Sequence, residues 1–305
     1  MLSVVIAALN NEDTLGRTLS SLFSNKLSSG EFEVIVVDNG SKDKTIDVAN
    51  EFPAKVFSCL KRGQGAARNV GLSKASGDIV CLTDADIVVP EDWLESISEF
   101  FARCPRADGV GGTVLAPVTG HLNKLQKLEG EVYARTHIFP TETVESKFGD
   151  NIGMLYSANC AFRSEALASS GGFDESGLDA VDIDLCWRLI LNGKHLVFDP
   201  DLKVVHLGFP WSLSGVFSQQ FRWGKSRGIL NMRYPRARFL NTGLRAKINM
   251  YYFPYVLFSQ ILVSKNKKKS ALQLFEKSAF TCGCMSAFLN AWFKHETFPM
   301  QLGGR

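Results

Sequence analysis

The sequence predicts an α/β protein with a mostly parallel central sheet flanked by helices, followed by a C-terminal helical extension. Three observations support this fold class. Short β-branched runs alternate with segments that carry apolar residues at helical spacing. Polar clusters follow these runs, as they follow the strands of parallel sheets. The composition, 45% hydrophobic and 21% charged over 305 residues, is that of a folded protein and excludes a disordered or polytopic membrane chain.

The first elements repeat a pattern of strand and helix. Strands are expected at Val4–Leu9, Val34–Val37 and Ile79–Thr83. Between the first two, apolar side chains line one helical face at Leu15, Leu19, Leu22 and Phe23. Strand, helix and strand within about 35 residues make a βαβ unit, whose strands run parallel. The pattern continues with a helix at Thr45–Phe52, a strand at Val56–Cys59 and a helix at Ala66–Ala75.

The second half is less regular. A helix is expected at Pro90–Ala102, because Pro suits the first helical position and Glu91 and Asp92 suit the first turn. Further elements are expected as a strand at Gly109–Ala116, helices at Leu122–Arg135 and Ile183–Leu191, and a strand at Leu202–Val205. The glycines of Gly63–Gly71 provide flexible backbone but lack the spacing of a P-loop or a dinucleotide fingerprint, which disfavours NAD binding and ATP hydrolysis.

Charge divides the chain into two parts. The net charge of +3 combines −11 before Lys203 with +14 from Lys203 to Arg305, where 16 basic residues stand against 2 acidic ones. We therefore expect a cation at the acidic front and an anionic substrate or surface at the basic back. Nucleic acid is not expected as a partner, because the front is acidic and no nucleic-acid-binding motif is present. The basic stretch Lys225–Lys247 places the expected boundary between a domain of residues 1–224 and a tail of residues 225–305.

The tail is expected to lie on a membrane surface. Its uncharged stretches, Ile248–Ser264 and Ser278–Phe293, have 17 and 16 residues and fall short of the roughly 20 that a spanning helix needs. Aromatic-rich helices held by Lys and Arg against anionic lipid fit this pattern, and a soluble helical cap is the alternative. Seven scattered cysteines and an opening segment without signal-peptide features indicate a reduced compartment. The expected location is therefore cytoplasmic, with peripheral attachment to the cytosolic face of a membrane.

Two acidic pairs are candidates for chemistry. Asp84 and Asp86 follow the strand Ile79–Thr83 and can share a hard divalent cation whose other positions are filled by phosphate oxygens. The alternative is that they only terminate the strand. Asp182 and Asp184 lie at the start of a predicted helix, where one of them can act as a general base or both can cap the helix.

Three further places suggest ligand contacts. Asp38, at the end of the second strand, can bind a nucleotide base or ribose, or can cap its own turn. The segment Gln219–Trp223 joins two amides to Arg222 and Trp223, which suit a diphosphate and a sugar face, or helix packing alone. His206 follows the last predicted strand and is either a metal or phosphate contact or an ordinary surface residue.

Taken together, these motifs resemble the inverting nucleotide-sugar glycosyltransferases of family 2, which have the GT-A fold with a Rossmann-like sheet. The resemblance covers roughly residues 2 to 225. It rests on Ser3–Glu12, Val36–Ser41, Ala67–Gly71, Asp84–Asp86, Ser157–Arg163, Gly171–Glu175, Val181–Leu185 and Gln219–Trp223. Each motif is weak singly, but all of them stand in the family's order.

The resemblance implies a role for each motif. Asp182 is the expected catalytic base. The expected nucleotide-sugar contacts are Ala8, Asn10, Glu12, Asp38, Arg68, Asp84 and Arg222. The expected acceptor contacts are Asn159, Gln219, Gln220 and Trp223. A divalent cation, Mg²⁺ or Mn²⁺, is expected on Asp84 and Asp86, with His206 left open as a further ligand.

Two features qualify the resemblance. Val181 replaces the usual first acid of its motif while Asp182 is kept, so base catalysis is expected and the orientation of the acceptor is left open. Gln219–Trp223 satisfies the Gln-Gln-x-Arg-Trp motif of synthases that make cellulose and hyaluronan, but the long transmembrane helices of those enzymes are not found here, which leaves processivity open.

The expected function is metal-dependent, inverting transfer of a sugar from a nucleotide-diphosphate sugar, first of all a UDP-sugar, to a hydroxyl of a glycan or lipid-linked acceptor. The setting would be polysaccharide or glycoconjugate synthesis. Two alternatives are an inactive scaffold that binds the nucleotide sugar and a sugar nucleotidyltransferase.

Overall fold

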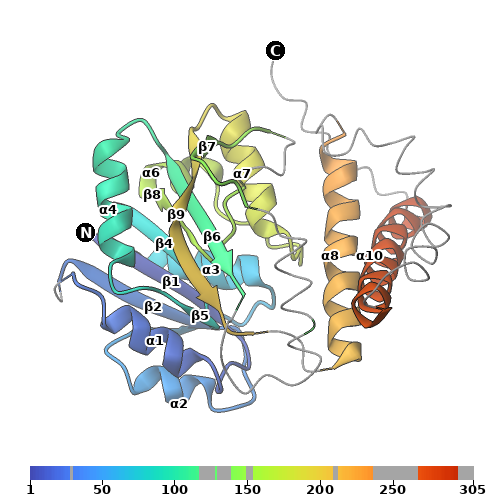
Figure 1. Ribbon diagram of the computed structural model, residues 1–305, viewed down its shortest axis with the longest axis horizontal. Coiled ribbons are helices and arrows are strands. Elements are labelled where there is room, and N and C mark those ends of the chain that lie inside the picture. The colour runs from blue at the N-terminus through green and yellow to red at the C-terminus, as the bar shows by residue number, and fades with distance from the viewer. Residues whose placement is uncertain are drawn as a thin grey trace. The chain divides into compact units, whose positions relative to one another are not determined.

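The computed structural model describes residues 1–27, 30–116, 128, 139–148, 154–208, 212–235 and 267–294. The chain divides into two compact units. Unit 1 comprises Met1–Pro117, Phe139–Lys147 and Asn151–Gly208, and unit 2 comprises Val118–Ile138, Phe148–Asp150 and Phe209–Arg305. Unit 1 contains the sheet, whereas the described elements of unit 2 are the helices α8 and α10 (Figure 1).

Unit 1 is built on a sheet with the strand order β3-β2-β1-β4-β8-β6-β9-β5, and β7 pairs with β9. The strands are β1 (Leu2–Ala8), β2 (Phe32–Asp38), β3 (Lys55–Ser58), β4 (Ile79–Asp84), β5 (Ile87–Val88), β6 (Gly109–Leu115), β7 (Val144–Glu145), β8 (Cys160–Arg163) and β9 (Leu196–His206). The helices of this unit are α1 (Leu15–Phe23), α2 (Thr45–Asn50), α3 (Gln64–Lys74), α4 (Trp93–Arg103), α6 (Ser164–Ser170) and α7 (Val181–Leu191).

The longer ladders of the sheet are parallel. β1 lies between β2 and β4 and runs parallel to both, β3 extends this parallel group, and β6 runs parallel to β9. β8 runs antiparallel between β4 and β6, which joins the two parallel groups. The predicted α/β fold with a mostly parallel sheet flanked by helices is confirmed.

One strand is much longer than expected. The predicted strand Leu202–Val205 is only part of β9, which has 11 residues. Pro200 and its acidic neighbours interrupt the apolar pattern, and the register with β6 shifts between Gly112 and Thr113. A bulge tolerates such residues within a strand, which is why the local pattern hid the first part of β9.

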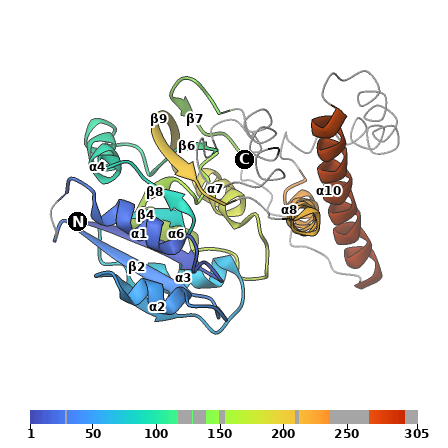
Figure 2. The ribbon, with the colours of Figure 1, turned by 60° about the horizontal axis from the view of Figure 1, so that its bottom comes forward.

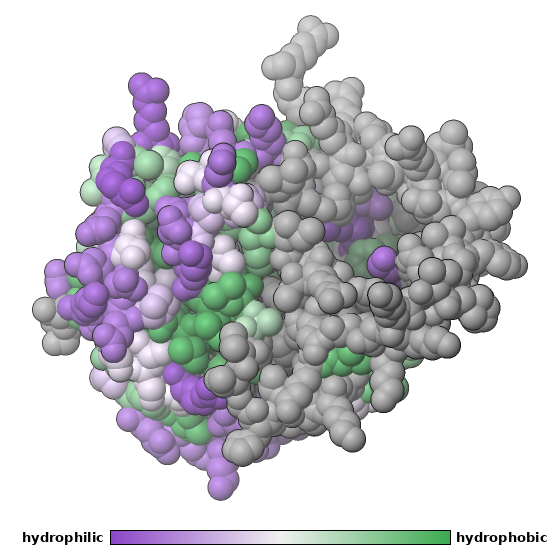
Figure 3. Space-filling view, viewed as in Figure 1, coloured by the Kyte–Doolittle hydropathy of each residue, from purple (hydrophilic) through white to green (hydrophobic). Residues whose placement is uncertain are grey.

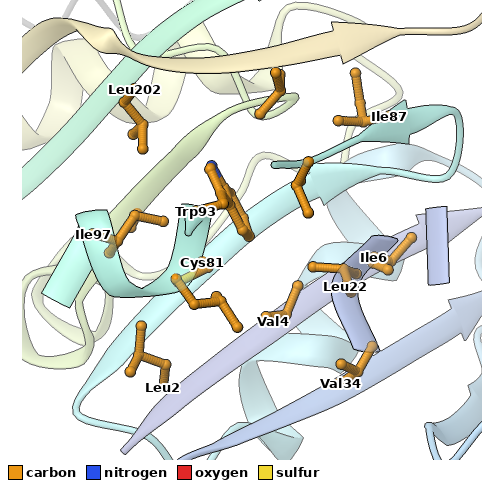
Figure 4. Packing of buried hydrophobic residues seen from close by; sticks show 14 of the residues in the cluster. Leu2, Val4, Ile6, Leu22, Val34, Cys81, Ile87, Trp93, Ile97 and Leu202 are labelled. Carbon is orange, nitrogen blue, oxygen red and sulfur yellow. The ribbon is translucent and has the colours of Figure 1, made fainter. Parts of the chain in front are cut away.

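The side chains of β1 point alternately to the two faces of the sheet, and helices cover both faces. Leu2, Val4 and Ile6 join the buried cluster that α1 and α4 cover on one face (Figures 1, 2 and 4). Val5 points to the other face, where α3 packs so closely that a Cβ on Gly71 would overlap the Val5 side chain. The helices keep polar outer sides, as the hydrophilic surface over α4 shows (Figure 3).

The glycines near α3 serve packing more than flexibility. Gly65 and Gly71 lie inside the helix, and a Cβ on Gly65 would overlap the carbonyl oxygen of Asp174. Only Gly63, which precedes the helix, has a positive φ, of 127°. The predicted helix Ala66–Ala75 corresponds to α3, and two of the glycines of Gly63–Gly71, expected to provide flexible backbone, instead allow close contact with the sheet and a neighbouring loop.

In unit 2, α8 (Leu213–Arg233) and α10 (Lys267–Lys294) lie side by side (Figures 1 and 2). Glycines make the contact, since a Cβ on Gly224 would overlap the backbone of Phe280, and one on Gly283 would overlap that of Phe221. The uncharged stretch Ser278–Phe293 belongs to α10. Among the residues that the structure describes, no helix has both the length and the apolar character to cross a bilayer.

Two expected segments lie outside the described residues. One is the predicted helix Leu122–Arg135, of which only Leu128 is described, and the other is the uncharged stretch Ile248–Ser264.

Glu33 ties several strands together at the amino ends of the sheet. Its carboxylate accepts hydrogen bonds from Ser3 Oγ at 2.6 Å and from Ser76 N at 2.8 Å, and it pairs with Lys55 Nζ at 2.7 Å. Burial raises the pKa of Glu33, but the bonds from Lys55, Ser3 and Ser76 outweigh it and lower the pKa to about 2. Since the unfolded pKa is higher, this carboxylate stabilises the fold at neutral pH, and the contribution is lost as the pH falls from about 4.5 toward about 2.

We predict that Glu33→Gln lowers the free energy of unfolding by about 2 kcal/mol at pH 7 and by much less near pH 2. Urea denaturation at both pH values measures the difference. The exposed Glu99→Gln serves as the matched control and should show little change at either pH. Equal losses for Glu33→Gln at both pH values would contradict the assignment.

Candidate active site

The loops that follow β1 and β2 are joined by hydrogen bonds. Asn10 N donates to Ser41 Oγ and Lys42 N donates to Asn10 Oδ1, both at 2.9 Å. Lys44 N donates to Glu12 Oε2, also at 2.9 Å. Asn10 has a φ of 55°, a left-handed conformation that Asn tolerates better than most residues. Asn10 and Glu12, expected to contact a nucleotide, are thus exposed side chains on a fixed edge of the sheet.

Ala8 and Asp38 are buried residues at the ends of β1 and β2, directly before these loops. Ala8 is 1% exposed, and its carbonyl oxygen accepts a hydrogen bond from Asn39 N. Asp38 is 3% exposed and accepts hydrogen bonds from Gly40 N and Ser41 N at 3.0 and 3.2 Å. Both residues are buried, and the Asp38 carboxylate caps its own turn. Their contacts with a nucleotide stay predictions.

Asp84 and Asp86 lie at the carboxyl end of β4, on either side of a buried alanine. His206 Nε2 is 3.6 Å from Asp86 Oδ2, because Ile87 pairs with His206 in the ladder of β5 and β9. Burial raises the pKa of Asp86, the charge of His206 opposes this shift, and the charge of Asp84 reinforces it. The two acids and the histidine therefore form one electrostatic group.

Arg68 is the buried cation of the site. Its guanidinium donates to Asp84 Oδ1 at 2.8 Å and to Gln64 Oε1 at 3.3 Å, and its Cζ lies 5.6 Å from the centre of the Phe173 ring. The residue is only 2% exposed. Within the pair, Asp84 is the more exposed member, with a side chain that is half-buried. The direct contact of Arg68 with a nucleotide sugar stays a prediction.

Asp182 lies in the first turn of α7. Its carboxylate accepts hydrogen bonds from Ile183 N at 2.8 Å and from Ser157 N at 3.4 Å. Burial raises the pKa of Asp182, Arg68 and the two backbone bonds lower it, and Asp84 raises it. An aspartate with a raised pKa near other charged groups is suited to accept a proton.

Asp184 is a structural residue. Its side chain is 1% exposed and pairs with Arg188, whose Nε lies 2.8 Å away. Arg188 also donates to the carbonyl oxygens of Ser170 and Gly172, which ties α7 to the end of α6. Of the two candidate acids at the start of α7, Asp182 alone is thus left for proton transfer.

Asn159 is fully buried. It is 0% exposed, and its side chain accepts a bond from Trp93 Nε1 at 2.9 Å and donates to the carbonyl oxygens of Thr113 and Leu202. Asn159 thereby joins α4, β6 and β9 inside the core. Its contact with an acceptor stays a prediction.

The remaining predicted contacts lie on α8 of unit 2. Gln219 and Gln220 are partly buried, whereas Arg222 and Trp223 are exposed. In unit 1 the structure pairs Arg68 with Asp84 and Asp86 with His206. The charges of Arg68 and Asp84 act on Asp182.

The carboxylates fit part of a metal site. The described residues contain no cluster of three or more His, Cys, Asp or Glu side chains that would hold a metal ion by themselves. Asp84 and Asp86 are hard oxygen ligands with side chains 33% and 24% exposed, so oxygen atoms of a substrate can approach beside them. This donor set suits Mg²⁺ or Mn²⁺, which protein sites often bind through one or two carboxylates and substrate phosphates.

Two supporting residues were not foreseen from the sequence. Phe173 lies within the motif Gly171–Glu175, and its ring covers Arg68. Gly208 passes over the site so closely that a Cβ there would overlap Asp86 Oδ2. Neither role has a local signal, because both depend on contacts between segments far apart in the chain.

Comparison with known proteins identifies the family. A model described as glycosyl transferase family 2 matches residues 3–171, more than half of the chain. The pre-mycofactocin glycosyltransferase of Mycobacterium tuberculosis is 29% identical over 243 residues, which are 76% of this chain and 48% of that protein. Poly-beta-1,6-N-acetyl-D-glucosamine synthase of Staphylococcus epidermidis is 27% identical over 266 residues, 85% of this chain and 61% of the relative. The chain thus spans about half to three fifths of these relatives.

Solved structures share the architecture. TarS 1-349 of S. aureus in complex with UDP matches with a TM-score of 0.57 and 18% identity, over 99% of this chain and 94% of that one. The mannosyltransferase PcManGT from Pyrobaculum calidifontis, in complex with GDP-Man and Mn²⁺, gives a TM-score of 0.63 and 17% identity, over 97% and 88%. The likeness at these identities concerns the fold, which is GT-A. The chain belongs to glycosyl transferase family 2.

Proposed function

We propose that this glycosyltransferase transfers a sugar from a nucleotide-diphosphate sugar, first of all a UDP-sugar, to a hydroxyl of a glycan or lipid-linked acceptor, with inversion at the anomeric carbon. The observation that supports the proposal is Asp182, an acid in the first turn of α7 whose pKa is raised by burial and also shifted by the charges of Arg68 and Asp84. The relatives named as a glycosyltransferase and a polysaccharide synthase support the reaction class. The UDP complex of TarS supports the choice of donor to test first.

The chemistry assigned to the chain is a single displacement. Asp182 accepts the proton of the acceptor hydroxyl, and the hydroxyl oxygen forms a bond to the anomeric carbon from the face opposite the diphosphate. The bond between the anomeric carbon and the diphosphate oxygen breaks, and the nucleoside diphosphate leaves with the electron pair. The fixed loops with Asn10 and Glu12 border the donor nucleotide in this proposal.

Asp84 and Asp86 are the proposed residues for Mg²⁺ or Mn²⁺, with His206 beside Asp86 as a further candidate. A cation bound there would supply positive charge for the leaving diphosphate. Arg68 keeps Asp84 oriented toward this role through its 2.8 Å bond. The Mn²⁺ complex of PcManGT supports testing this metal.

The residues of α8 complete the proposal. We assign Arg222 to the diphosphate and Trp223, with Gln219 and Gln220, to the acceptor, because guanidinium and indole side chains suit these groups and both are exposed. In this assignment residues 1–224 form the catalytic domain. Residues 225–305 form a basic tail that attaches to the cytosolic face of a membrane.

For the base, we predict that Asp182→Asn lowers the rate of sugar transfer or donor hydrolysis by about a hundredfold or more, because no carboxylate remains to accept the proton. Release of nucleoside diphosphate from UDP-, GDP- and dTDP-sugars measures the rate. In the wild type, activity should be lost as the pH falls through the pKa of Asp182, which burial places above the usual aspartate value.

The exposed Asp92→Asn is the control for this experiment and should keep the rate. Donor binding without release by the wild type, with every acceptor and in water, would contradict the transferase and favour the scaffold alternative. A product that keeps the nucleotide phosphate would favour the nucleotidyltransferase.

For the metal, we predict that Asp86→Asn raises the Mn²⁺ concentration needed for half-maximal activity by about tenfold or more, since one of two carboxylate ligands is lost. EDTA should abolish the wild-type activity, and added Mn²⁺ should restore it. Asp78→Asn changes a carboxylate whose side chain is 90% exposed and should match the wild type. Full activity in EDTA would overturn the assignment.

For the tail, we predict that the full chain floats with vesicles that contain phosphatidylglycerol but does not float with vesicles of pure phosphatidylcholine. The reason is that each basic residue near an anionic surface contributes about 1 kcal/mol to the free energy of binding. Changing Lys267, Lys268 and Lys269 to Gln should weaken flotation. The same number of changes on unit 1, at Lys74, Arg103 and Arg106, is the control. A chain that remains wholly in the soluble fraction would exclude membrane attachment.

A further inference from the structure

A loop before α7 contacts the buried Arg68, which pairs with Asp84, the carboxylate proposed to bind the donor. The loop contributes Phe173, which is 4% exposed and whose ring lies 5.6 Å from Cζ of Arg68. Arg68 in turn holds Asp84 Oδ1 at 2.8 Å. A buried guanidinium needs partners on every side to offset its lost hydration, and a ring face is one such partner.

The position of the ring is fixed by the residue that follows Arg68. Asn69 Oδ1 accepts a hydrogen bond from Phe173 N at 2.8 Å, and Asn69 Nδ2 donates to Phe173 O at 3.0 Å. The same amide nitrogen donates to Glu175 Oε1 at 2.7 Å, and Lys61 pairs with the other oxygen of Glu175 at 2.7 Å. Both backbone groups of Phe173 are therefore held by α3.

The loop continues directly into α7. Gly171 and Gly172 have positive φ values of 75° and 78°, which turn the chain after α6 so that Phe173 faces α3. A few residues later the chain enters α7, whose first turn carries Asp182. The loop thus connects the segment that carries the proposed base with the residue that orients Asp84.

We propose that Phe173 is a positioning residue that couples the loop before α7 to the donor-side carboxylate: its ring holds Arg68, and Arg68 holds Asp84. This inference rests on the proposed function, in which Asp84 binds the donor diphosphate through a cation. The charge of Arg68 also acts on Asp182, whose pKa burial raises and Arg68 lowers. A displaced ring would disturb both ends of the site.

Phe173→Leu tests the proposal, because leucine keeps apolar bulk but has no ring face. We expect the KM for the donor to rise about threefold to tenfold with a smaller change in kcat, and calorimetry should show a matching loss of UDP affinity in the presence of Mn²⁺. Phe173→Tyr restores a ring face and should return both values toward the wild type. Asn69→Ser leaves the ring but removes its clamp, and it should change the KM in the same direction if Phe173→Leu does not fold.

The chain contains a matched control. Phe101 is also 4% exposed, and its ring lies 5.0 Å from Cζ of Arg163, in a contact that involves none of the proposed site residues. Phe101→Leu should lower the melting temperature as Phe173→Leu does, yet leave the KM for the donor unchanged. An active wild type with equal KM values for Phe173→Leu and Phe101→Leu would overturn the positioning role alone. A wild type that neither binds nor cleaves any donor would overturn the proposed function, and the positioning role with it.

Discussion

The ion pair between Arg68 and Asp84 is the interaction on which the rest of the site depends. Burying a guanidinium is costly, and it is tolerated here because Asp84, Gln64 and the ring of Phe173 replace the lost hydration. The same contacts fix three segments against each other: α3, the end of β4 and the loop before α7. Because Arg68 is buried and Asp84 is partly exposed, the pair presents an oriented carboxylate to the solvent and places a positive charge behind it.

Hydrogen bonds also fix the loops at the carboxyl ends of β1 and β2. Backbone groups after β2 bond to side chains after β1, as Lys42 N does to Asn10 and Lys44 N does to Glu12. Asp38 holds its own turn from within. A loop that is already ordered would lose less conformational entropy on binding a ligand than a mobile loop would. The buried Asp38 therefore differs from the exposed Asn10 and Glu12, although all three belong to motifs of the same family.

In unit 2, one helix presents two contrasting faces. Gly224 is buried against the backbone of α10, whereas its neighbours Arg222 and Trp223 are exposed, the latter by 37%. The glycine contact lets the two helix backbones approach closely, and Phe217 of α8 also packs against Phe275 of α10. The close approach explains why small residues lie in a segment whose motif residues are large.

The sequence by itself determined the alternation of strands and helices, the fold class, and the acids that stand after β4 and at the start of α7, because periodicity and turn chemistry act over a few residues. It did not determine which of these side chains are buried. Asn159 bonds to Trp93, 66 residues away, and Arg68 lies under Phe173, so only the tertiary structure assigned them supporting roles. The same holds for β8, whose antiparallel position between β4 and β6 follows from long-range pairing. Local patterns encode which face of an element is apolar, whereas burial and charge partners arise from packing between distant segments.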